Sequence, residues 1–419
     1  MLAEILSTGE ELRTGSLVDT NAAYIAEKLY FLGINLNRIQ CVGDNIEILT
    51  QTLQEISKRA DIAIVTGGLG PTSDDLTAEA ASKASEKELI FNEKAFDLIK
   101  KFFENMGRTM SDSNRKQAFF PLTSEIIKND IGTAPGFCLK INKCMFFFLP
   151  GVPVEMKKML NDYVIPKIQN GKNLNIPLLK TLIIFGLPES KAGTLTKDIP
   201  DLYPGINIGT RAKLPEIQIK LYTNYNNNIN KELLTNAFEF AKKQLKKWII
   251  SENGESIELV VGNLLKQRYQ TLSIAESCTG GHISDLITSV PGSSDYFLFS
   301  AVTYSNQAKE KILNVSSDTL MKHGAVSIET VKEMAKGARD ITNSTYAIAT
   351  SGIAGPGGGT DDKPVGTLCI GFADKEKIEG FKYFLPFGNR EQKKKIFAMA
   401  ALDLLRRKIS GLPELTIGK

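Results

Sequence analysis

Histidine is scarce in this chain, since His282 and His323 are the only two among 419 residues. A histidine-based catalytic triad or a histidine-rich metal site therefore has almost nothing to be built from. The five cysteines form no C-x-x-C pair, which disfavours zinc and redox motifs, and their odd number without framework spacing suits a reducing cytosol. Cys41, Cys138 and Cys369 lie in apolar, strand-like segments, so we expect them in the core.

Long apolar runs and a strong excess of one charge are also missing. No run of about 20 apolar residues occurs, and charged residues soon follow the short apolar start at residues 1–6, so we expect neither a transmembrane helix nor a signal peptide. The net charge is only +4, without a basic stripe. The lysine-rich segments 242–247 and 393–395 favour solvated helix faces over sites for a phosphate backbone. We expect a cytoplasmic protein with no membrane and no direct nucleic-acid partner.

The first 170 residues alternate between strand and helix patterns. Short apolar runs at residues 2–6, 34–42 and 61–66 predict strands. The segments between these strands have helical periodicity and predict helices, and Asp19, Thr20 and Asn21 are candidate cap residues of the first helix. This β-α-β-α-β order predicts a mostly parallel sheet with helices on both faces.

Two compositional breaks divide the rest of the chain. Residues 171–177 read as a linker, and strands at 181–185 and 217–222 with an amphipathic helix at 233–248 follow it. A second break at 251–255 precedes another alternation of helices and strands. The expected fold class is therefore α/β, with two α/β domains of mostly parallel sheets joined by a small α+β domain. The predicted domains are residues 1–170, 171–252 and 253–419, and the predicted elements of the last are a helix at 257–267, strands at 272–275, 296–303, 346–350 and 366–372, and a closing helix at 391–408.

The strongest chemical motif is ESCTGG at residues 276–281, which ends a predicted strand and opens a helix. Ligands of α/β sheets gather at the carboxyl ends of strands. Glycines there permit close backbone approach, and the helix N-terminus offers unpaired N–H groups to an anion. Thr279 is a candidate cap of that helix. The alternative is an ordinary turn rich in glycine and threonine.

A second motif, VTYSNQAK at residues 302–309, places Lys309 one turn into a helix that follows a strand. A lysine that is partly desolvated beside a hydroxyl loses its proton more easily and can serve as a base. Ser–Lys pairs carry out nucleophilic catalysis without histidine. The alternative is a lysine on the surface.

A third motif, TSGIAGPGGGT at residues 350–360, also follows a predicted strand. So many glycines in one loop indicate a mobile, close-fitting cover or a cradle for a phosphate. A flexible linker is the alternative, although two apolar strands flank the loop tightly.

Glycine-rich turns also follow two strands of the first domain, at residues 7–12 and 66–75. Glycine after a strand suits contact with phosphate. The paired carboxylates of Asp74 and Asp75 suit a hard cation such as Mg²⁺, or they cap the following helix.

Residues 255–410 resemble the C-terminal domain of the CinA family, the nicotinamide-mononucleotide deamidase fold, through ESCTGG, PGSS, VTYSNQAK, SGIAGPGGGT and KPVGT. The resemblance implies Ser277 as the nucleophile on the carboxamide carbon, Lys309 as the general base and Tyr304 as a residue that orients or relays the proton, with no cofactor. Relatives often carry threonine at Ser351, which is also a hydroxyl. Thr279 and Ser294 match positions that line the family's site. The backbone of Gly280, Gly281, Ser351, Gly352, Gly355, Gly357 and Gly358 supplies candidates for the oxyanion hole and phosphate site, with Arg390 as a phosphate partner.

The first domain resembles the molybdopterin-binding (MogA/MoeA-like) domain that opens CinA proteins, with further matches at residues 114–118, 132–137 and 149–156. In that family the domain is associated with ADP-ribose pyrophosphatase activity, which implies Mg²⁺ or a similar cation held in part by Asp74 or Asp75. The middle domain of relatives is KH-like, and relatives imply a homodimer. The candidate substrate-binding residues are Gly9, Glu10, Asp19, Asn21, Gly67, Gly68, Gly70 and Thr72.

Three functions compete for these features. The first is a bifunctional hydrolase of pyridine-nucleotide salvage, with nicotinamide mononucleotide and ADP-ribose as substrates. The second is a non-enzymatic protein that binds molybdopterin or a nucleotide. The third is a competence-related factor that acts through a protein partner, because the low net charge disfavours direct DNA binding. The combination of Ser277, Tyr304 and Lys309 favours the enzyme.

Overall fold

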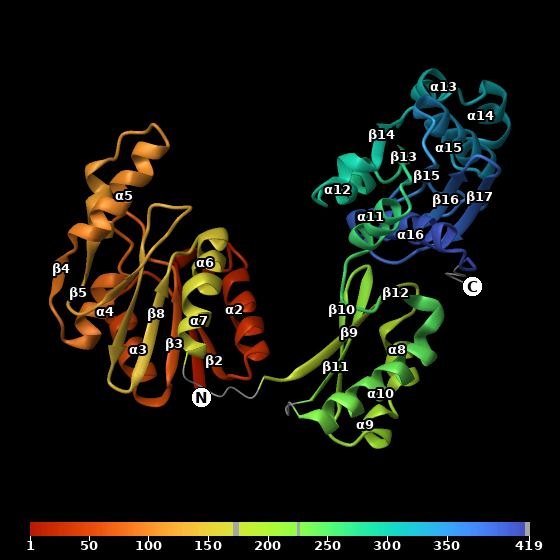
Figure 1. Cartoon of the computed structure of the whole chain (residues 1–419). Helices are drawn as coiled ribbons and strands as arrows, with labels where there is room; N and C mark the ends of the chain where they lie inside the picture. The colour runs from red at the N-terminus through yellow and green to blue at the C-terminus, as the bar shows by residue number, and fades with distance from the viewer. Residues whose placement is uncertain (171–175, 224–226, 415–419) are drawn as a thin grey trace. The chain divides into compact units, whose positions relative to one another are not determined.

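The computed structural model describes residues 1–170, 176–223 and 227–414, and the chain forms two compact units (Figure 1). The first unit is Met1–Pro177, and the second comprises Leu178–Thr223 and Asn227–Lys419. The boundary coincides with the end of the predicted linker, of which residues 171–175 lie outside the described residues. Within the described ranges, no helix is both long and apolar enough to cross a membrane.

The first unit is built on a six-stranded sheet with the order β2-β1-β3-β8-β7-β6. The four strands from β2 to β8 run parallel, as the alternating pattern predicts. The strands β7 and β8 form a hairpin around Asn142, and β6 pairs antiparallel with β7. Such a short connection leaves no room for the crossover that parallel strands require. The strands are β1 (Leu2–Thr8), β2 (Asn35–Val42), β3 (Ile62–Thr66), β6 (Glu125–Ile127), β7 (Gly136–Ile141) and β8 (Cys144–Leu149), with a separate ribbon of β4 (Leu89–Phe91) and β5 (Phe119–Pro121).

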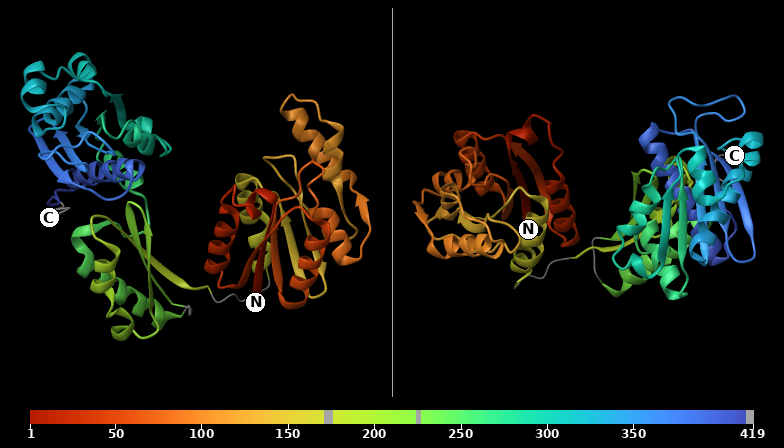
Figure 2. Two further views of the ribbon diagram at one scale, coloured as in Figure 1. Left: turned by 180° about the vertical axis from the view of Figure 1, so that it is seen from behind. Right: turned by 90° about the horizontal axis from the view of Figure 1, so that it is seen from above.

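Helices cover both faces of this sheet (Figure 2). Alternate residues of β3 reach opposite cores, with Ile62 and Ile64 on one face and Ala63 and Val65 on the other. Asp19 caps its helix by accepting the Ala22 N–H at 2.8 Å, as predicted. One face carries α2 (Thr20–Phe31), α6 (Pro153–Met159), η2 (Leu160–Val164) and α7 (Ile165–Gln169), and the other carries α3 (Ile46–Arg59) and α4 (Thr77–Ser85).

The expectation that three cysteines lie in the core is wrong for one of them. Cys138 and Cys369 are buried, but Cys41 is exposed. Cys41 belongs to β2, which is the edge strand of the sheet, so its side chain has a neighbouring strand on one side only.

The C-terminal part of the second unit contains a five-stranded sheet with the order β14-β13-β15-β16-β17. The first three strands are parallel, whereas β16 and β17 run antiparallel to their neighbours, so the sheet is mixed rather than mostly parallel. No helix lies between β15 and β16, and without a crossover helix the chain returns antiparallel. The strands are β13 (Leu272–Glu276), β14 (Phe297–Val302), β15 (Tyr346–Gly352), β16 (Thr367–Ala373) and β17 (Ile378–Phe384).

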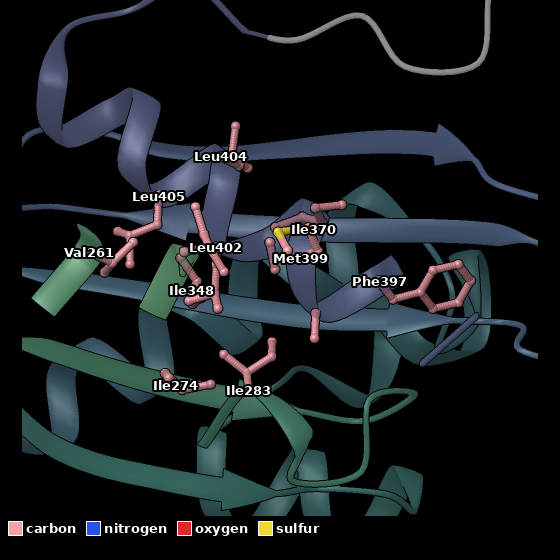
Figure 3. Packing of buried hydrophobic residues seen from close by; sticks show 14 of the residues in the cluster. Val261, Ile274, Ile283, Ile348, Ile370, Phe397, Met399, Leu402, Leu404 and Leu405 are labelled. Carbon is pink, nitrogen blue, oxygen red and sulfur yellow. The ribbon is translucent and has the colours of Figure 1, made fainter. Parts of the chain in front are cut away.

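The long helix α16 (Arg390–Ser410) packs its middle turns against this sheet. Figure 3 shows Met399 and Leu402 of α16 beside Ile348 and Ile370 of the strands. The helices α11 (Ile257–Gln267) and α12 (His282–Thr288) join the same core, and α15 (Ile328–Thr342) covers the opposite face with α13 (Asn306–Leu313) and α14 (Ser317–His323).

The middle part of the chain forms a four-stranded antiparallel sheet with the order β10-β11-β9-β12. In β9, Leu182 and Ile184 pack into a core with α10, whereas Ile183 joins the core of the C-terminal sheet. This shared core places the middle and C-terminal parts in one compact unit, and the predicted boundary between them stays a prediction. The elements are β9 (Leu178–Ile184), α8 (Glu189–Thr196), α9 (Ile199–Leu202), β10 (Asn207–Lys213), β11 (Glu216–Thr223), α10 (Asn228–Leu245), η3 (Lys246–Trp248) and β12 (Ile249–Ser251).

The closest packing of α15 on the sheet predicts a destabilising substitution. A Cβ atom at Gly371 of β16 would stand 1.9 Å from the carbonyl oxygen of Val331 in α15, so Gly371→Ala must push the helix off the sheet. We expect a loss of about 1–3 kcal/mol in the free energy of unfolding, measured by denaturant titration. Gly193→Ala is the matched control, since its methyl group meets nothing within 4 Å and α8 should gain about 0.5–1 kcal/mol. An unchanged midpoint for Gly371→Ala would contradict this packing.

Candidate functional site

The ESCTGG segment turns the chain sharply from β13 into α12. Gly280 and Gly281 have φ angles of 62° and 93°, in the left-handed region where a glycine is favoured. Ser277 is the first residue after the strand, and its side chain is largely buried. Its backbone N–H donates to the carbonyl of Thr350 at 3.0 Å, so the neighbouring strand β15 fixes its position.

Lys309 reaches Ser277 from α13. Its Nζ lies 3.2 Å from Ser277 Oγ, 2.8 Å from the carbonyl oxygen of Thr303 and 3.2 Å from that of Tyr304. The lysine side chain runs back toward the start of its helix, in the direction that Cα–Cβ bonds take in helices. Ser305 caps this helix by accepting the Ala308 N–H at 3.1 Å. The structure thus brings together the predicted nucleophile and the predicted base.

The surroundings of the Lys309 amine favour its neutral form. Lys309 is fully buried, and burial lowers its pKa from the usual lysine value. Its three hydrogen-bond partners are a hydroxyl and two carbonyls, and among the described residues no carboxylate forms an ion pair with it. An amine that has lost its proton can accept the proton of the Ser277 hydroxyl at the observed separation.

The free helix N-terminus expected after the glycine pair is not available to a ligand. The buried carboxylate of Glu276 accepts the N–H groups of Gly281 at 2.9 Å, Ile283 at 3.2 Å and Ser284 at 2.9 Å, and also the Ser284 hydroxyl. The protein therefore supplies its own anion to α12, which fixes the turn that carries Ser277. The sequence-based interpretation overlooked this role, although Glu276 opens the motif.

Thr279 does not cap α12, contrary to expectation. The cap position is Gly281, and the Thr279 hydroxyl instead forms a hydrogen bond with the Thr350 hydroxyl at 2.8 Å. The N–H of Gly280 donates to the carbonyl of Ser277 at 3.2 Å. Among the described residues, the N–H group of Thr279 has no hydrogen-bond partner and that of Cys278 contacts only its own side chain, so they are the better candidates for an oxyanion hole.

Arg390 connects the second and third motifs. Its guanidinium donates to the carbonyl of Gly355 at 2.6 Å and to the Tyr304 hydroxyl at 3.3 Å. Tyr304 is 64% exposed, and its carbonyl, rather than its phenol, contacts Lys309. Arg390 is itself exposed in the first turn of α16. This places a positive charge beside the exposed tyrosine and the glycine-rich loop.

Other predicted residues have different surroundings. The Ser351 hydroxyl donates to the carbonyl of Ala325 at 2.6 Å, which anchors the start of the glycine-rich loop. Gly352 lies against Cys278, whose Sγ would be 3.2 Å from an added Cβ. Ser294 is exposed on the turn before β14 and has no hydrogen bond to Ser277 or Lys309 within the described chain, and Gly357 and Gly358 are also exposed.

Lys394 is a further basic residue near this turn. Its Nζ would lie 3.3 Å from a Cβ atom at Gly280, and its side chain is half-buried. Lys394 stands four residues after Arg390, so both lie on one face of α16. The prediction of a solvated helix face for residues 393–395 is wrong for Lys393, which is buried and donates to the carbonyl of Gly388. Lys394 is half-buried because α16 packs against the turn at Gly280.

The first unit carries a separate pocket of about 440 Å³ at the carboxyl ends of β1, β3 and β8. Two predicted residues do not line it: Glu10 pairs with Arg13, and the Thr72 hydroxyl donates to Asp75 at 2.5 Å. Eight predicted residues do line the pocket, namely Gly9, Asp19, Asn21, Gly67, Gly68, Gly70, Asp74 and Asp75.

The lining of this pocket is strongly acidic. It contains six carboxylates and, among the described residues, no lysine, arginine or histidine. Burial raises the pKa values of Asp44 and Glu155, two of these acids that were not among the predicted site residues. Asp44 follows the edge strand β2, and Glu155 lies in the first turn of α6. The other four carboxylates are those of Glu11, Asp19, Asp74 and Asp75.

The Asp75 side chain has a role beyond the two that the sequence suggested, a cation ligand and a helix cap. It accepts the backbone N–H of Thr72 at 2.9 Å together with the hydroxyl, so it shapes its own loop. It does not cap α4, whose cap position is Leu76. Among the described residues, no three side chains of Asp, Glu, His or Cys converge as a ready-made metal site. A cation in this pocket would therefore need ligands from the substrate as well.

Comparisons with known proteins match the N-terminal and the C-terminal parts of the chain to different family models. Residues 254–409 match the model of the CinA C-terminal domain, and residues 4–170 match the model described as "Probable molybdopterin binding domain". A CinA-like protein of Desulfosudis oleivorans is 47% identical over 412 residues, covering 98% of this chain and all of that protein. A CinA-like protein of Desulforapulum autotrophicum is 46% identical over 416 residues, covering 98% of each chain.

A relative with a more specific name is the nicotinamide-nucleotide amidohydrolase PncC of Shewanella oneidensis. It is 42% identical over 410 residues, which cover 98% of this chain and 96% of that protein. Two family models together span most of the sequence, and full-length relatives share more than 40% of its residues. The chain therefore belongs to the CinA family, with an N-terminal domain of the molybdopterin-binding type and a C-terminal CinA domain.

Proposed function

We propose that the C-terminal domain hydrolyses the amide of nicotinamide mononucleotide to nicotinate mononucleotide and ammonia. The observation that carries this proposal is the buried Lys309 amine, 3.2 Å from the Ser277 hydroxyl. A serine beside a lysine of lowered pKa is a nucleophile with its base. The name of the 42% identical Shewanella oneidensis protein supports a nicotinamide nucleotide as the substrate.

In the first half of the reaction, neutral Lys309 takes the proton of the Ser277 hydroxyl while Oγ attacks the carboxamide carbon. The carbonyl oxygen becomes an oxyanion, and the N–H groups of Cys278 and Thr279 stabilise it. As the C–N bond breaks, Lys309 returns the proton to the departing nitrogen, which leaves as ammonia. An ester between Ser277 and the nicotinate carbonyl remains.

In the second half, Lys309 takes a proton from water, and the resulting hydroxide attacks the ester carbon. The bond to Ser277 Oγ breaks, and Lys309 gives the proton back to that oxygen. The product carboxylic acid releases its proton to the solvent, nicotinate mononucleotide leaves, and both side chains return to their starting state. The reaction needs no metal ligand and no histidine.

Two cations of α16 fit the phosphate of the substrate. Arg390 lies beside the glycine-rich loop, and Lys394 lies beside the turn at Gly280. A guanidinium and an ammonium on one helix face provide several donors to a phosphate dianion. This arrangement favours a nucleotide over the corresponding nucleoside.

Removal of the nucleophile should abolish deamidation. Ser277→Ala takes away the only atom that forms the acyl-enzyme, and it removes little volume from the core. We expect ammonia release from nicotinamide mononucleotide to fall to background, with an unchanged thermal unfolding midpoint as the control for folding. A rate within about tenfold of the unmodified protein, equivalent to about 1.4 kcal/mol of barrier, would contradict the role of Ser277.

The pH profile tests the base. Because only neutral Lys309 accepts a proton, the rate should rise with pH as Lys309 deprotonates and then level off. Lys309→Arg should be almost as inactive as Lys309→Ala, because a guanidinium stays protonated. His282→Ala is the comparison variant, since His282 lies in the helix after the turn, and it should retain far more activity. An inactive His282→Ala beside an active Lys309→Arg would make the histidine the base.

For the first domain we propose metal-dependent cleavage of ADP-ribose to AMP and ribose 5-phosphate. The acidic lining of its pocket favours this second activity, because a diphosphate enters a pocket lined by six carboxylates only together with compensating cations. Mg²⁺ or a similar ion would be held in part by Asp74 or Asp75 and by the substrate phosphates. A purely molybdopterin- or nucleotide-binding domain is the alternative, and it would give no turnover.

Chelation should separate the two activities. With EDTA present, we expect deamidation to continue at its full rate and ADP-ribose cleavage to stop, because only the latter uses a cation. The double variant Asp74→Ala/Asp75→Ala should lose the cleavage and keep the deamidation, as followed by AMP and ammonia release from the same preparation. Cleavage that persists in EDTA or in the double variant would refute the assignment to this pocket.

A further inference from the structure

A pocket of about 430 Å³ in the second unit belongs to none of the chemistry described so far. It lies where the end of α10 and η3 meet the last turns of α16, and Figure 1 labels both long helices. Five of its lining residues are cationic, and no carboxylate is among the lining residues that the structure describes. The cations are Lys243, Lys246, Lys247, Arg406 and Arg407.

The two arginines bring an uncompensated positive charge into the protein. Asp403 accepts hydrogen bonds from Arg406 at 2.7 and 3.0 Å and from Arg407 at 2.7 Å. All three side chains are at most 7% exposed, so one carboxylate faces two guanidinium groups in a buried cluster. Buried charge without a partner is costly, and an anion in the adjoining pocket would compensate it.

Arg406 keeps donors available for such an anion. Arg407 donates further to the carbonyls of Pro413, at 3.0 Å, and Lys247, whereas Arg406 donates to Asp403 through Nε and Nη2. Its Nη1 group has no hydrogen-bond partner among the described residues. A guanidinium with one free edge matches the oxygen atoms of a phosphate.

The lysines of the pocket differ from the neighbouring Lys242, which forms ion pairs with Glu239 and Glu252. Lys243 and Lys246 are exposed and have no ion pair among the described residues. Lys243, Lys246 and Lys247 are exposed, as the interpretation of this run as a solvated helix face predicts, whereas Lys242 is half-buried and ion-paired. No carboxylate among the described residues neutralises the pocket lysines. They are placed to bind a phosphate group together with Arg406.

The other walls of the pocket are apolar and include the only tryptophan of the chain. Trp248 is half-buried, with the ammonium of Lys247 at 4.3 Å from its ring. Ile249, Leu412 and Pro413 are the other apolar lining residues, and Gln244 adds an uncharged polar one. An apolar, aromatic surface beside a cationic one suits a ligand with a flat ring system and a phosphate group.

We propose that this pocket is a binding site for a nucleoside phosphate, separate from the site of Ser277 and Lys309. The ring system of the ligand packs against Trp248 and its apolar neighbours. The phosphate lies between Lys246 and the free edge of Arg406. This assignment does not depend on the proposed deamidation, because it shares no residue with that site.

The single tryptophan allows a direct test on the full chain. Titration with AMP should change the fluorescence of Trp248 in a saturable way, and adenosine and inorganic phosphate, as the two halves of the ligand, should each bind about tenfold more weakly or worse. Lys246→Glu should weaken AMP binding about tenfold or more, since it replaces a phosphate partner by a repelling charge. Lys231→Glu is the matched control, because Lys231 is an exposed lysine of α10, the helix that ends just before Lys246, and it does not line the pocket.

Each outcome decides the proposal. Saturable binding of AMP that Lys246→Glu weakens and Lys231→Glu leaves unchanged would establish the site. No saturable fluorescence change, or equal weakening by both variants, would overturn it. Phosphate alone binding as tightly as AMP would overturn the aromatic half of the assignment. Deamidation by Lys246→Glu should stay unchanged, which keeps this test separate from that of the Ser277 mechanism.

Discussion

The contact between a buried amine and a hydroxyl, Lys309 with Ser277, is the interaction on which the C-terminal domain is organised. A fully buried lysine without a carboxylate partner weakens the folded state unless its amine is neutral or its donors are satisfied. The protein supplies two carbonyls and the serine hydroxyl and no compensating charge. Burial in these uncharged surroundings lowers the pKa of Lys309, so the packing that encloses the amine also prepares it to act as a base.

Parallel strands explain why the groups meet. The carboxyl ends of β14, β13 and β15 lie side by side, and each is followed by one of the three motifs. Ser277 follows the central strand of these three, Lys309 approaches from the segment after one neighbour, and Thr350 fixes the serine from the other. Glu276 completes the arrangement, because its carboxylate accepts hydrogen bonds from the N–H groups at the start of α12. The glycine-rich turn is thus held by a carboxylate of the protein, and a ligand has to use other N–H groups.

The sequence predicted most elements, because apolar periodicity is a local signal. The pairing of Ser277 with Lys309 was expected from the resemblance to the CinA family, and the structure shows the contact. The sequence did not predict which acceptor each N–H or hydroxyl group of the site donates to. That Glu276 occupies the N–H groups of α12, that Ser351 donates to Ala325 and that Cys41 lies on an edge strand all depend on which segments become neighbours. The sequence also did not predict that β16 runs antiparallel to β15, because an apolar strand pattern does not indicate the direction of the strand in the sheet. The acids Asp44 and Glu155 join the first pocket from segments that are far apart in the sequence.

The helix α16 touches two chemically distinct places. Arg390 in its first turn donates to the glycine-rich loop, and Arg406 and Arg407 near its end line the cationic pocket. At 1.5 Å per residue, its 21 residues span about 30 Å. Arg390 and Arg406 are 16 positions apart on this helix, so about 24 Å of unbroken α-helix separates the glycine-rich loop from the cationic pocket. One rigid element therefore fixes the spacing between the two places.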